Sequence, residues 1–293
     1  AMLVEKYIDT AMPNASQNEK IIASQYVLAN CGYNVRLALC GNHVVMLIPY
    51  VEHVFEKSYL NIDGKRYYIY PNVEDEGSFR SCELPKGAEL GKDMGLRFSG
   101  KTVIGDEAKP FRYEAAGITL QGEVPTGVMP LLDEYPIIDI PTVAASVVDK
   151  SLRDDVVKQI RAQVQDLSEQ EAANRILRFI QKGFPYATDD EQFHREKYFY
   201  FEESLYYPKN DCEDRAIFYA YLVHEILGLD VHLIQFTGHE CTAVAFHEPV
   251  ENGTSYEYKG KKFYICDPTY IGAKIGKCMP SYAKESPQIE VWY

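Results

Sequence analysis

Apolar residues in the C-terminal half of the chain recur first with a helical period. In segment 151–164, SLRDDVVKQIRAQV, they are spaced three and four positions apart, which is typical of an amphipathic helix. Segment 167–185, LSEQEAANRILRFIQKGFP, shows the same spacing. It opens with Ser168 and Glu171, the pair that forms a capping box, and closes with Gly and Pro, which end helices. The pattern predicts two consecutive helices.

The next segment, 184–211, has no clean period. It reads FPYATDDEQFHREKYFYFEESLYYPKND and is dense in aromatic and acidic residues. We expect a long ordered loop. A loop of this length inside a compact domain is usually functional.

The periodicity then changes from that of a helix to that of strands. A helical pattern begins at Cys212 and stops at Gly228. Strand patterns come next in 229–236 (LDVHLIQF), in 237–246 (TGHECTAVAF, after its turn) and in a hairpin over 254–270 (TSYEYKGKKFYICDPTY). Helices followed by antiparallel strands predict an α+β fold for this half.

The middle of the chain, residues 73–145, is rich in Gly, Pro and β-branched residues. Segments 96–105 (LRFSGKTVIG) and 117–124 (GITLQGEV) have strand character, and prolines interrupt the segment from 125 to 141. We expect a small β-rich bridging module without chemistry of its own.

The N-terminal segment partly repeats the C-terminal one at a constant offset of 196 positions. The matches include glycines, apolar residues and a histidine, and they hold without a gap: Gly32–Gly228, Val35–Val231, Leu37–Leu233, His43–His239, Gly64–Gly260 and Tyr68–Tyr264. Under this offset Cys212 falls on Ser16 and Asp267 falls on Pro71. We expect residues 1–72 to be a degenerate copy of the C-terminal unit that has lost its chemistry. The alternative is a chance match between two helix–strand–hairpin segments with glycine stops.

Charge and cysteine content exclude several function classes. The formal net charge of −13 disfavours nucleic acid or an anionic membrane surface as the main partner, because both require clustered Lys and Arg. No apolar stretch is long enough to span a membrane. The seven cysteines include no C-x-x-C pair, so we expect no zinc ribbon, no metal and no other cofactor. One disulfide stays open, although the sequence identifies no pair for it, and the oligomeric state stays open as well.

Candidate chemistry gathers at Cys212, His239 and Asp267. A thiol attacks as its thiolate, and the partial positive charge of a helix N-terminus favours that form. The nucleophile also needs a base held in orientation by a third group. His239 opens one predicted strand and Asp267 ends the next, and adjacent strands lie only about 4.8 Å apart. Glu213 and Asp214 suit the helix dipole but oppose the thiolate.

A stabilising site for the oxyanion of acyl transfer is also expected. The backbone N–H of Cys212 is one candidate donor, and Gln192, in the preceding loop, is a tentative second. The alternative for Gln192 is an ordinary loop-bracing side chain.

Three stretches, DCEDRAIFYAYLVHEILGLDV, GHECTAVAF and KGKKFYICDPTYIGAKIG, resemble the transglutaminase-like family of papain-type cysteine enzymes. They are most similar to its bacterial members, and the resemblance covers about 165–282. It implies a papain/transglutaminase-like catalytic domain over 146–293, with a helix that bears the cysteine and an antiparallel sheet that bears the histidine and aspartate. On the matching positions Cys212 would be the nucleophile, His239 its histidine and Asp267 the orienting carboxylate.

The resemblance also places Gln192 in the D-x-x-QF element of these members. The chain departs from the commoner HAWVEV pattern, because Glu240 and Cys241 follow the histidine and no Trp is present there. Peptide and other amide substrates therefore both stay open.

The function implied is a peptidase or amidase that cleaves peptide or isopeptide amides through a thioester, with a peptide or protein as substrate. A protein cross-linking transglutaminase is one alternative. A non-catalytic binding or assembly module that retains the fold is another. The resemblance points to a bacterial protein, and a periplasmic or secreted location is favoured over the cytoplasm if a signal peptide has been removed before the opening AM.

Overall fold

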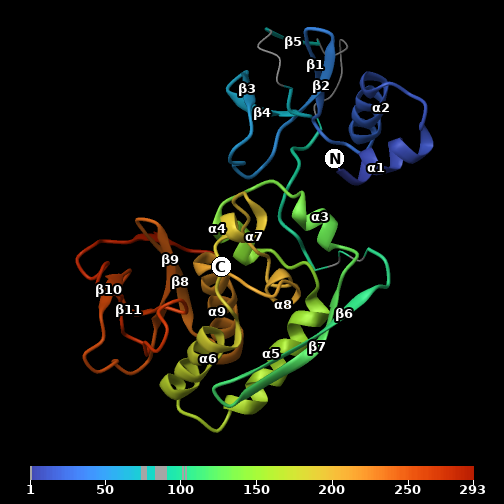
Figure 1. Ribbon diagram of the computed structural model, residues 1–293. Helices are drawn as coiled ribbons and strands as arrows, with labels where there is room; N and C mark the ends of the chain where they lie inside the picture. Colours follow the sequence, from blue (N-terminus) through green and yellow to red (C-terminus); the bar gives the residue numbers. More distant parts are fainter. Residues whose placement is uncertain (1, 74–77, 83–90, 101, 103) are drawn as a thin grey trace. The chain divides into compact units, whose positions relative to one another are not determined.

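A computed structural model describes residues 2–73, 78–82, 91–100, 102 and 104–293. The chain divides into two compact units, Ala1–Leu96 and Arg97–Tyr293. Both combine helices with antiparallel strands, so the α+β class expected for the chain is present in each (Figure 1). The unit boundary coincides with neither of the boundaries expected after residues 72 and 145.

The first unit places two helices before a five-stranded antiparallel sheet of order β3-β4-β2-β1-β5. Its elements are α1 (Met2–Ala11), α2 (Gln17–Asn30), β1 (Arg36–Cys40), β2 (His43–Ile48), β3 (Tyr59–Ile62), β4 (Lys65–Tyr70) and β5 (Phe79–Ser81). Ser16 and Glu19 form a capping box at the start of α2. Ile21 and Leu28 of α2 pack with Met46 of β2, which fixes the helix against the sheet.

The second unit begins with a β-hairpin and a series of helices. They are β6 (Ala108–Ala115), β7 (Ile118–Pro125), α3 (Met129–Asp133), α4 (Ile140–Ala145), α5 (Lys150–Val164), α6 (Glu169–Gly183), α7 (Asp189–Phe193), α8 (Glu203–Tyr206) and α9 (Cys212–Leu227). The helices predicted over 151–164 and 167–185 correspond to α5 and α6, and the capping box of Ser168 and Glu171 is present.

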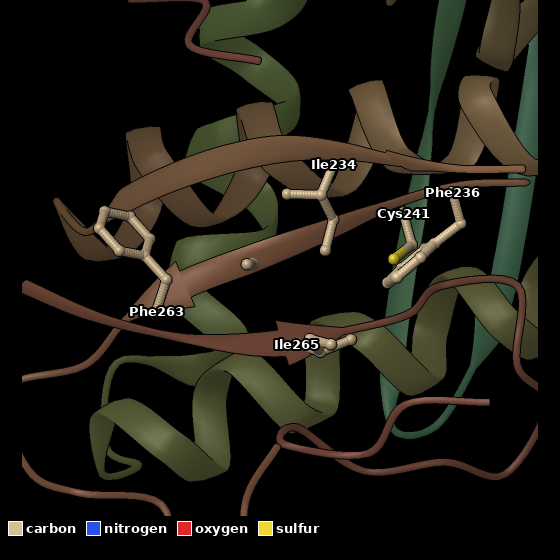
Figure 2. Packing of buried hydrophobic residues seen from close by; sticks show 6 residues of the cluster. Ile234, Phe236, Cys241, Phe263 and Ile265 are labelled. Carbon is tan, nitrogen blue, oxygen red and sulfur yellow. The ribbon is translucent and has the colours of Figure 1, made fainter. Parts of the chain in front are cut away.

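A second five-stranded antiparallel sheet completes this unit, in the order β10-β11-β9-β8-β12. Its strands are β8 (Asp230–Phe236), β9 (His239–Ala245), β10 (Ser255–Tyr258), β11 (Lys261–Cys266) and β12 (Gln288–Glu290). Helix α9 packs on β8 and β9. Figure 2 shows the apolar cluster of this sheet, formed by Ile234, Phe236, Cys241, Ala243, Phe263 and Ile265 of β8, β9 and β11.

The middle of the chain differs from the β-rich bridging module expected there. Strand β7 forms where a strand was expected, but its hairpin with β6 packs on α5 and α6. An isolated hairpin is marginally stable, so this packing joins it to the second unit. Pro130 and Pro141, which were expected only to interrupt the segment, lie in the first turns of α3 and α4. Proline is tolerated there because the N–H groups of a first turn have no hydrogen-bond partner within the helix. Strand β5 instead joins the sheet of the first unit.

The segment 96–105 forms no strand in its described part. It contributes one isolated bridge, between Ser99 and Val147, and residues 101 and 103 of that prediction lie outside the described residues.

The two five-stranded sheets share strand order and strand direction, and strands β1–β4 share their register with β8–β11. Residues Leu47 and Ile69 pair across β2 and β4, and the positions 196 residues later, Ala243 and Ile265, pair across β9 and β11. β3 and β4 match β10 and β11 residue for residue at the same offset. β5 and β12 take the same place in the order without keeping the offset. The helix and antiparallel strands expected over 16–71 are therefore present.

Within the described residues, no helix has the length and apolar character needed to cross a bilayer. All seven cysteines fall in the described part, and none of them forms a disulfide there.

Candidate active site

Cys212 is the first residue of α9, and a hydrogen-bond network fixes that start. The carboxylate of Asp214 accepts hydrogen bonds from the N–H of Asp211 (3.3 Å) and from the N–H of Phe199 (2.8 Å). Because Phe199 belongs to the preceding aromatic loop, Asp214 ties that loop to the helix end that carries the cysteine.

His239 and Asp267 meet across neighbouring strands. His239 opens β9, Asp267 directly follows β11, and Nε2 of the imidazole lies 2.9 Å from Oδ2 of the carboxylate. Both residues are buried. The other carboxylate oxygen accepts hydrogen bonds from the N–H groups of Thr269 (2.9 Å) and Tyr270 (3.1 Å). The carboxylate is thus held on both sides, and no hydrogen bond within the described residues engages Nδ1 of His239.

Tyr282 covers the imidazole, a contact that the sequence did not reveal. Its ring stacks on His239 at 5.1 Å and 13°, and on Phe236 at 5.1 Å and 21°. Glu285, three residues later, accepts hydrogen bonds from the N–H (2.6 Å) and the hydroxyl (2.7 Å) of Thr237 in the β8–β9 turn. The loop is therefore anchored beside the histidine, and the stacked ring restricts rotation of the imidazole.

The Cys212 sulfur contacts the strand that carries His239, but its proton is directed elsewhere. The thiol donates a hydrogen bond to Oε2 of Glu213 (3.0 Å). Burial, and then the charge of Glu213, raise the pKa of this thiol, whereas a hydrogen bond from the backbone N–H of Glu240 lowers it. Among the described residues, no hydrogen bond joins the sulfur to His239. Burial and the Glu213 carboxylate therefore oppose the thiolate form of Cys212, which the helix N-terminus favours.

Arg215, three positions after Cys212, donates its guanidinium hydrogen bonds to residues other than the cysteine. Its guanidinium donates to Oδ1 of Asn210 (2.9 Å) and to the carbonyl of Phe184 (2.5 Å). These two contacts bind together the segments that flank the aromatic loop.

Three buried carboxylates gather beside the cysteine. Ligand atoms of Asp189, Asp211 and Glu213 all lie within 4.8 Å of one another. Oδ1 of Asp189 and Oδ1 of Asp211 have no hydrogen-bond partner in the part of the chain that the structure describes. Burial raises the pKa of Asp189 to about 6, and burial followed by the charge of Asp214 raises that of Asp211. Such an oxygen set could hold a hard divalent cation, which the sequence did not predict.

A second group with mixed ligand types involves the histidine itself. Ligand atoms of His239, Cys241 and Asp267 also lie within 4.8 Å of one another. Asp267 is already committed to His239 and to two backbone amides, so a metal here would compete with those bonds.

Gln192 lies on α7 with an unused donor. Its Nε2 is buried and has no hydrogen-bond partner among the described residues. Asp189, on the same short helix, lies within 4.8 Å of the carboxylates of Asp211 and Glu213, so α7 lies beside the start of α9. A free amide donor near that start is compatible with the expected oxyanion role, which stays a prediction.

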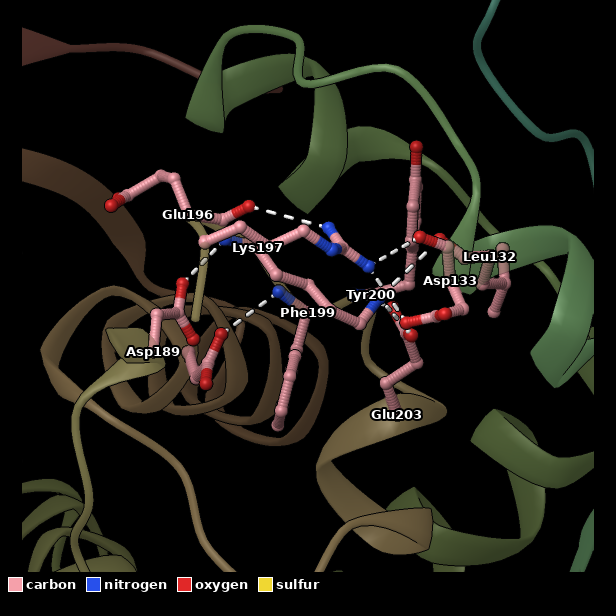
Figure 3. A network of polar contacts seen from close by, with 10 residues as sticks. Leu132, Asp133, Asp189, Glu196, Lys197, Phe199, Tyr200 and Glu203 are labelled. Atoms are coloured by element: carbon pink, nitrogen blue, oxygen red, sulfur yellow. Dashed lines mark hydrogen bonds and ion pairs between the residues drawn. The ribbon is translucent and has the colours of Figure 1, made fainter. Parts of the chain in front are cut away.

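The aromatic loop before α9 is ordered by buried polar contacts, as Figure 3 shows. Nζ of Lys197 lies 2.6 Å from the carboxylate of Glu203, and the N–H of Lys197 donates to Asp189 (2.5 Å). The segment expected to be a long loop contains the short helices α7 and α8 but is otherwise irregular. Its order fixes Asp189 among the acidic residues beside Cys212.

Glu240 is buried next to His239 without a hydrogen bond to its carboxyl group among the described residues. Burial, and then the charge of Glu290, raise the pKa of Glu240 to about 9 from an ordinary value of 4.5. Since the folded value is the higher one, the protonated carboxyl favours the fold. This contribution is complete below about pH 4.5 and is lost as the pH rises towards 9.

We therefore expect Glu240→Gln to match the wild type in stability near pH 5 and to be the more stable protein at pH 8. The difference in the free energy of unfolding between the variant and the wild type should grow by at most about 1.4 kcal/mol for each pH unit. Urea unfolding at both pH values measures it. Glu257→Gln, an exposed substitution in the same sheet, is the control and should show no such growth. A constant difference for Glu240→Gln at both pH values would contradict the prediction.

Comparison of the sequence with known protein families and with curated proteins gave no match.

Proposed function

We propose that the chain is a cysteine-dependent acyl-transfer enzyme that hydrolyses peptide or isopeptide amides through a thioester on Cys212. The observation that carries this proposal is the buried His239–Asp267 hydrogen bond beside a cysteine at a helix N-terminus. The backbone N–H of Glu240, which directly follows His239, lowers the pKa of the Cys212 thiol, and this effect indicates that the sulfur lies near the start of β9. The motif resemblance to transglutaminase-like enzymes supports the same assignment.

In the proposed mechanism, Nδ1 of His239 takes the thiol proton and the Cys212 sulfur attacks the amide carbonyl carbon. The backbone N–H of Cys212 and the amide of Gln192 would stabilise the oxyanion. The imidazolium, stabilised by Asp267, then protonates the leaving amine as the C–N bond breaks. Water attacks the thioester carbonyl carbon as His239 accepts a proton from it. The C–S bond then breaks, the carboxylic acid leaves, and the proton returns from His239 to the Cys212 sulfur.

An amine that replaces water in the last step would make the enzyme a cross-linking transglutaminase. The two reactions share every residue up to the thioester, so the assigned roles serve both.

A non-catalytic binding module is the second candidate, and one observation favours it. The Cys212 thiol donates to Glu213, and its pKa is raised rather than lowered. A protein without catalytic activity does not need the thiolate form, so a raised thiol pKa is compatible with a binding role.

We further propose that the first unit is a degenerate copy of the second. Ser16 stands at the position equivalent to Cys212, and its hydroxyl is bound to Glu19 (2.7 Å). His43 is exposed, and Pro71 replaces the orienting carboxylate. This unit would lack chemistry and serve to contact a partner.

Alkylation by substoichiometric iodoacetamide distinguishes the enzyme from the binding module. If His239 takes the thiol proton, Cys212 should react faster at pH 6 than the exposed Cys31 and Cys82, because the thiolate is the form that iodoacetamide alkylates. Peptide mass spectrometry after digestion measures all seven sites in one sample. Glu213→Gln should increase the Cys212 rate, because the Glu213 carboxylate contributes to the raised pKa. Slower reaction of Cys212 than of Cys31 at every pH would favour the binding module.

A further inference from the structure

A surface cavity of the second unit is lined by a cluster of cations. The cavity has a volume of about 490 Å³, and Arg175, Arg178, Lys182 and Lys274 lie on its wall. The acidic residue on the same wall is Glu171, whose carboxylate already accepts hydrogen bonds from the N–H (3.1 Å) and hydroxyl (2.7 Å) of Ser168. The cavity therefore presents positive charge.

These cations stand on elements that are fixed relative to one another. Arg175, Arg178 and Lys182 belong to α6. Lys274 lies in the loop after β11, and that loop is bound to α6 on both sides of it. The carbonyl of Ala273 accepts a hydrogen bond from Gln181 (3.2 Å), and the N–H of Ile275 donates to Asn174 (2.9 Å). The hydrogen bonds of Gln181 and Asn174 thus hold the backbone that carries Lys274 against the helix that carries the other three cations.

The cluster is unusual for a chain of this composition. Acidic residues outnumber basic ones, 43 to 30, yet Arg178, Lys182 and Lys274 form no ion pair within the described residues. Like charges three or four positions apart on a helix destabilise it slightly. A bound anion would remove that repulsion.

We propose that this cavity binds a small soluble ligand that carries two or more negative charges on phosphate groups. Arginine presents paired donors that match phosphate oxygens, and lysine adds point charges at adjustable positions. The volume falls within the range of small-molecule sites. The proposal is independent of the chemistry at Cys212.

Isothermal titration of the full chain with pyrophosphate at low salt tests the site. We expect saturable binding of one pyrophosphate that weakens as sodium chloride is added, because the contacts are ionic. Arg178→Glu combined with Lys274→Glu should weaken binding at least about tenfold. The control combines Lys158→Glu with Lys284→Glu, which makes the same change in net charge at exposed positions outside the cavity and should leave the affinity within about twofold.

Equal loss in both double variants would overturn the proposal, because it would indicate a non-specific response to net charge. Absence of saturable binding to the wild type would overturn it as well. So would binding only to vesicles that contain phosphatidylglycerol, since the ligand would then be a membrane surface. Should the charge reversal unfold the protein, as judged by circular dichroism, Arg178→Gln with Lys274→Gln carries the same expectation.

Discussion

Cys212→Ala is expected to reduce amide turnover by more than about a thousandfold while leaving the fold intact. The nucleophile is lost, whereas the start of α9 depends on Asp214 and the loop rather than on the thiol. Turnover would be measured against a library of peptides and isopeptides, with product release followed by mass spectrometry. Circular dichroism of the variant checks the fold.

Two further variants sharpen this result. Asp267→Asn should leave a fraction of the activity, because the carboxylate orients the imidazole without taking part in bond formation. Cys278→Ala removes a partly exposed thiol that packs against the apolar cluster of the second sheet shown in Figure 2. This variant should retain most of the activity. Wild-type rates from Cys212→Ala would contradict the mechanism, and equal losses from Cys212→Ala and Cys278→Ala would point to a general effect of removing a thiol.

The sequence predicted the elements that local signals define. Ser168 and Glu171 mark the start of α6 because the capping box is formed by neighbouring residues. Gly228 marks the end of α9 because its φ of 68° is one that other residues adopt at a cost. The alternation in β9 and β11 placed His239 and Asp267 at strand ends, and the regular spacing of antiparallel strands made their contact predictable.

Contacts that depend on tertiary closure could not be predicted in this way. Tyr282 lies in a segment without periodicity, and only the folding of its loop against the β8–β9 turn brings it onto His239. Strand β5 joins the first sheet through a pairing with β1 that no local signal specifies. The proline in the first turn of α4 was not expected to lie in a helix, because a proline there and one in a loop look alike in sequence.

The environment of the cysteine shows the same limit. The sequence places Glu213 next to Cys212, but adjacency does not say where either side chain points. The structure directs the thiol to the Glu213 carboxylate, and Asp189 approaches from a different helix to join the acidic group. The balance of charge around Cys212 is therefore a property of the fold rather than of the motif.

A buried ion pair joins helix α5 to the aromatic loop that precedes Cys212. Arg153 of α5 and Glu202 of the aromatic loop are each 1% exposed, and two hydrogen bonds of 2.7 and 3.0 Å join them. The guanidinium also lies over the rings of Phe201 and Tyr221, and Glu202 accepts a hydrogen bond from the N–H of Asp149 (2.9 Å). One carboxylate thus connects α5 to the segment that precedes the Cys212 helix.

We expect Glu202→Ala to lower the free energy of unfolding by about 3–5 kcal/mol, because it leaves the Arg153 cation buried without its partner. Urea denaturation followed by circular dichroism measures the change. Lys150→Ala, which breaks the exposed pair of Lys150 and Asp154 on the same helix, should cost less than about 0.5 kcal/mol. The combined variant Arg153→Met, Glu202→Leu should recover much of the loss, since it removes both charges together. A loss from Glu202→Ala as small as that of Lys150→Ala would show that water reaches Arg153 and that the pair does not hold the loop to α5.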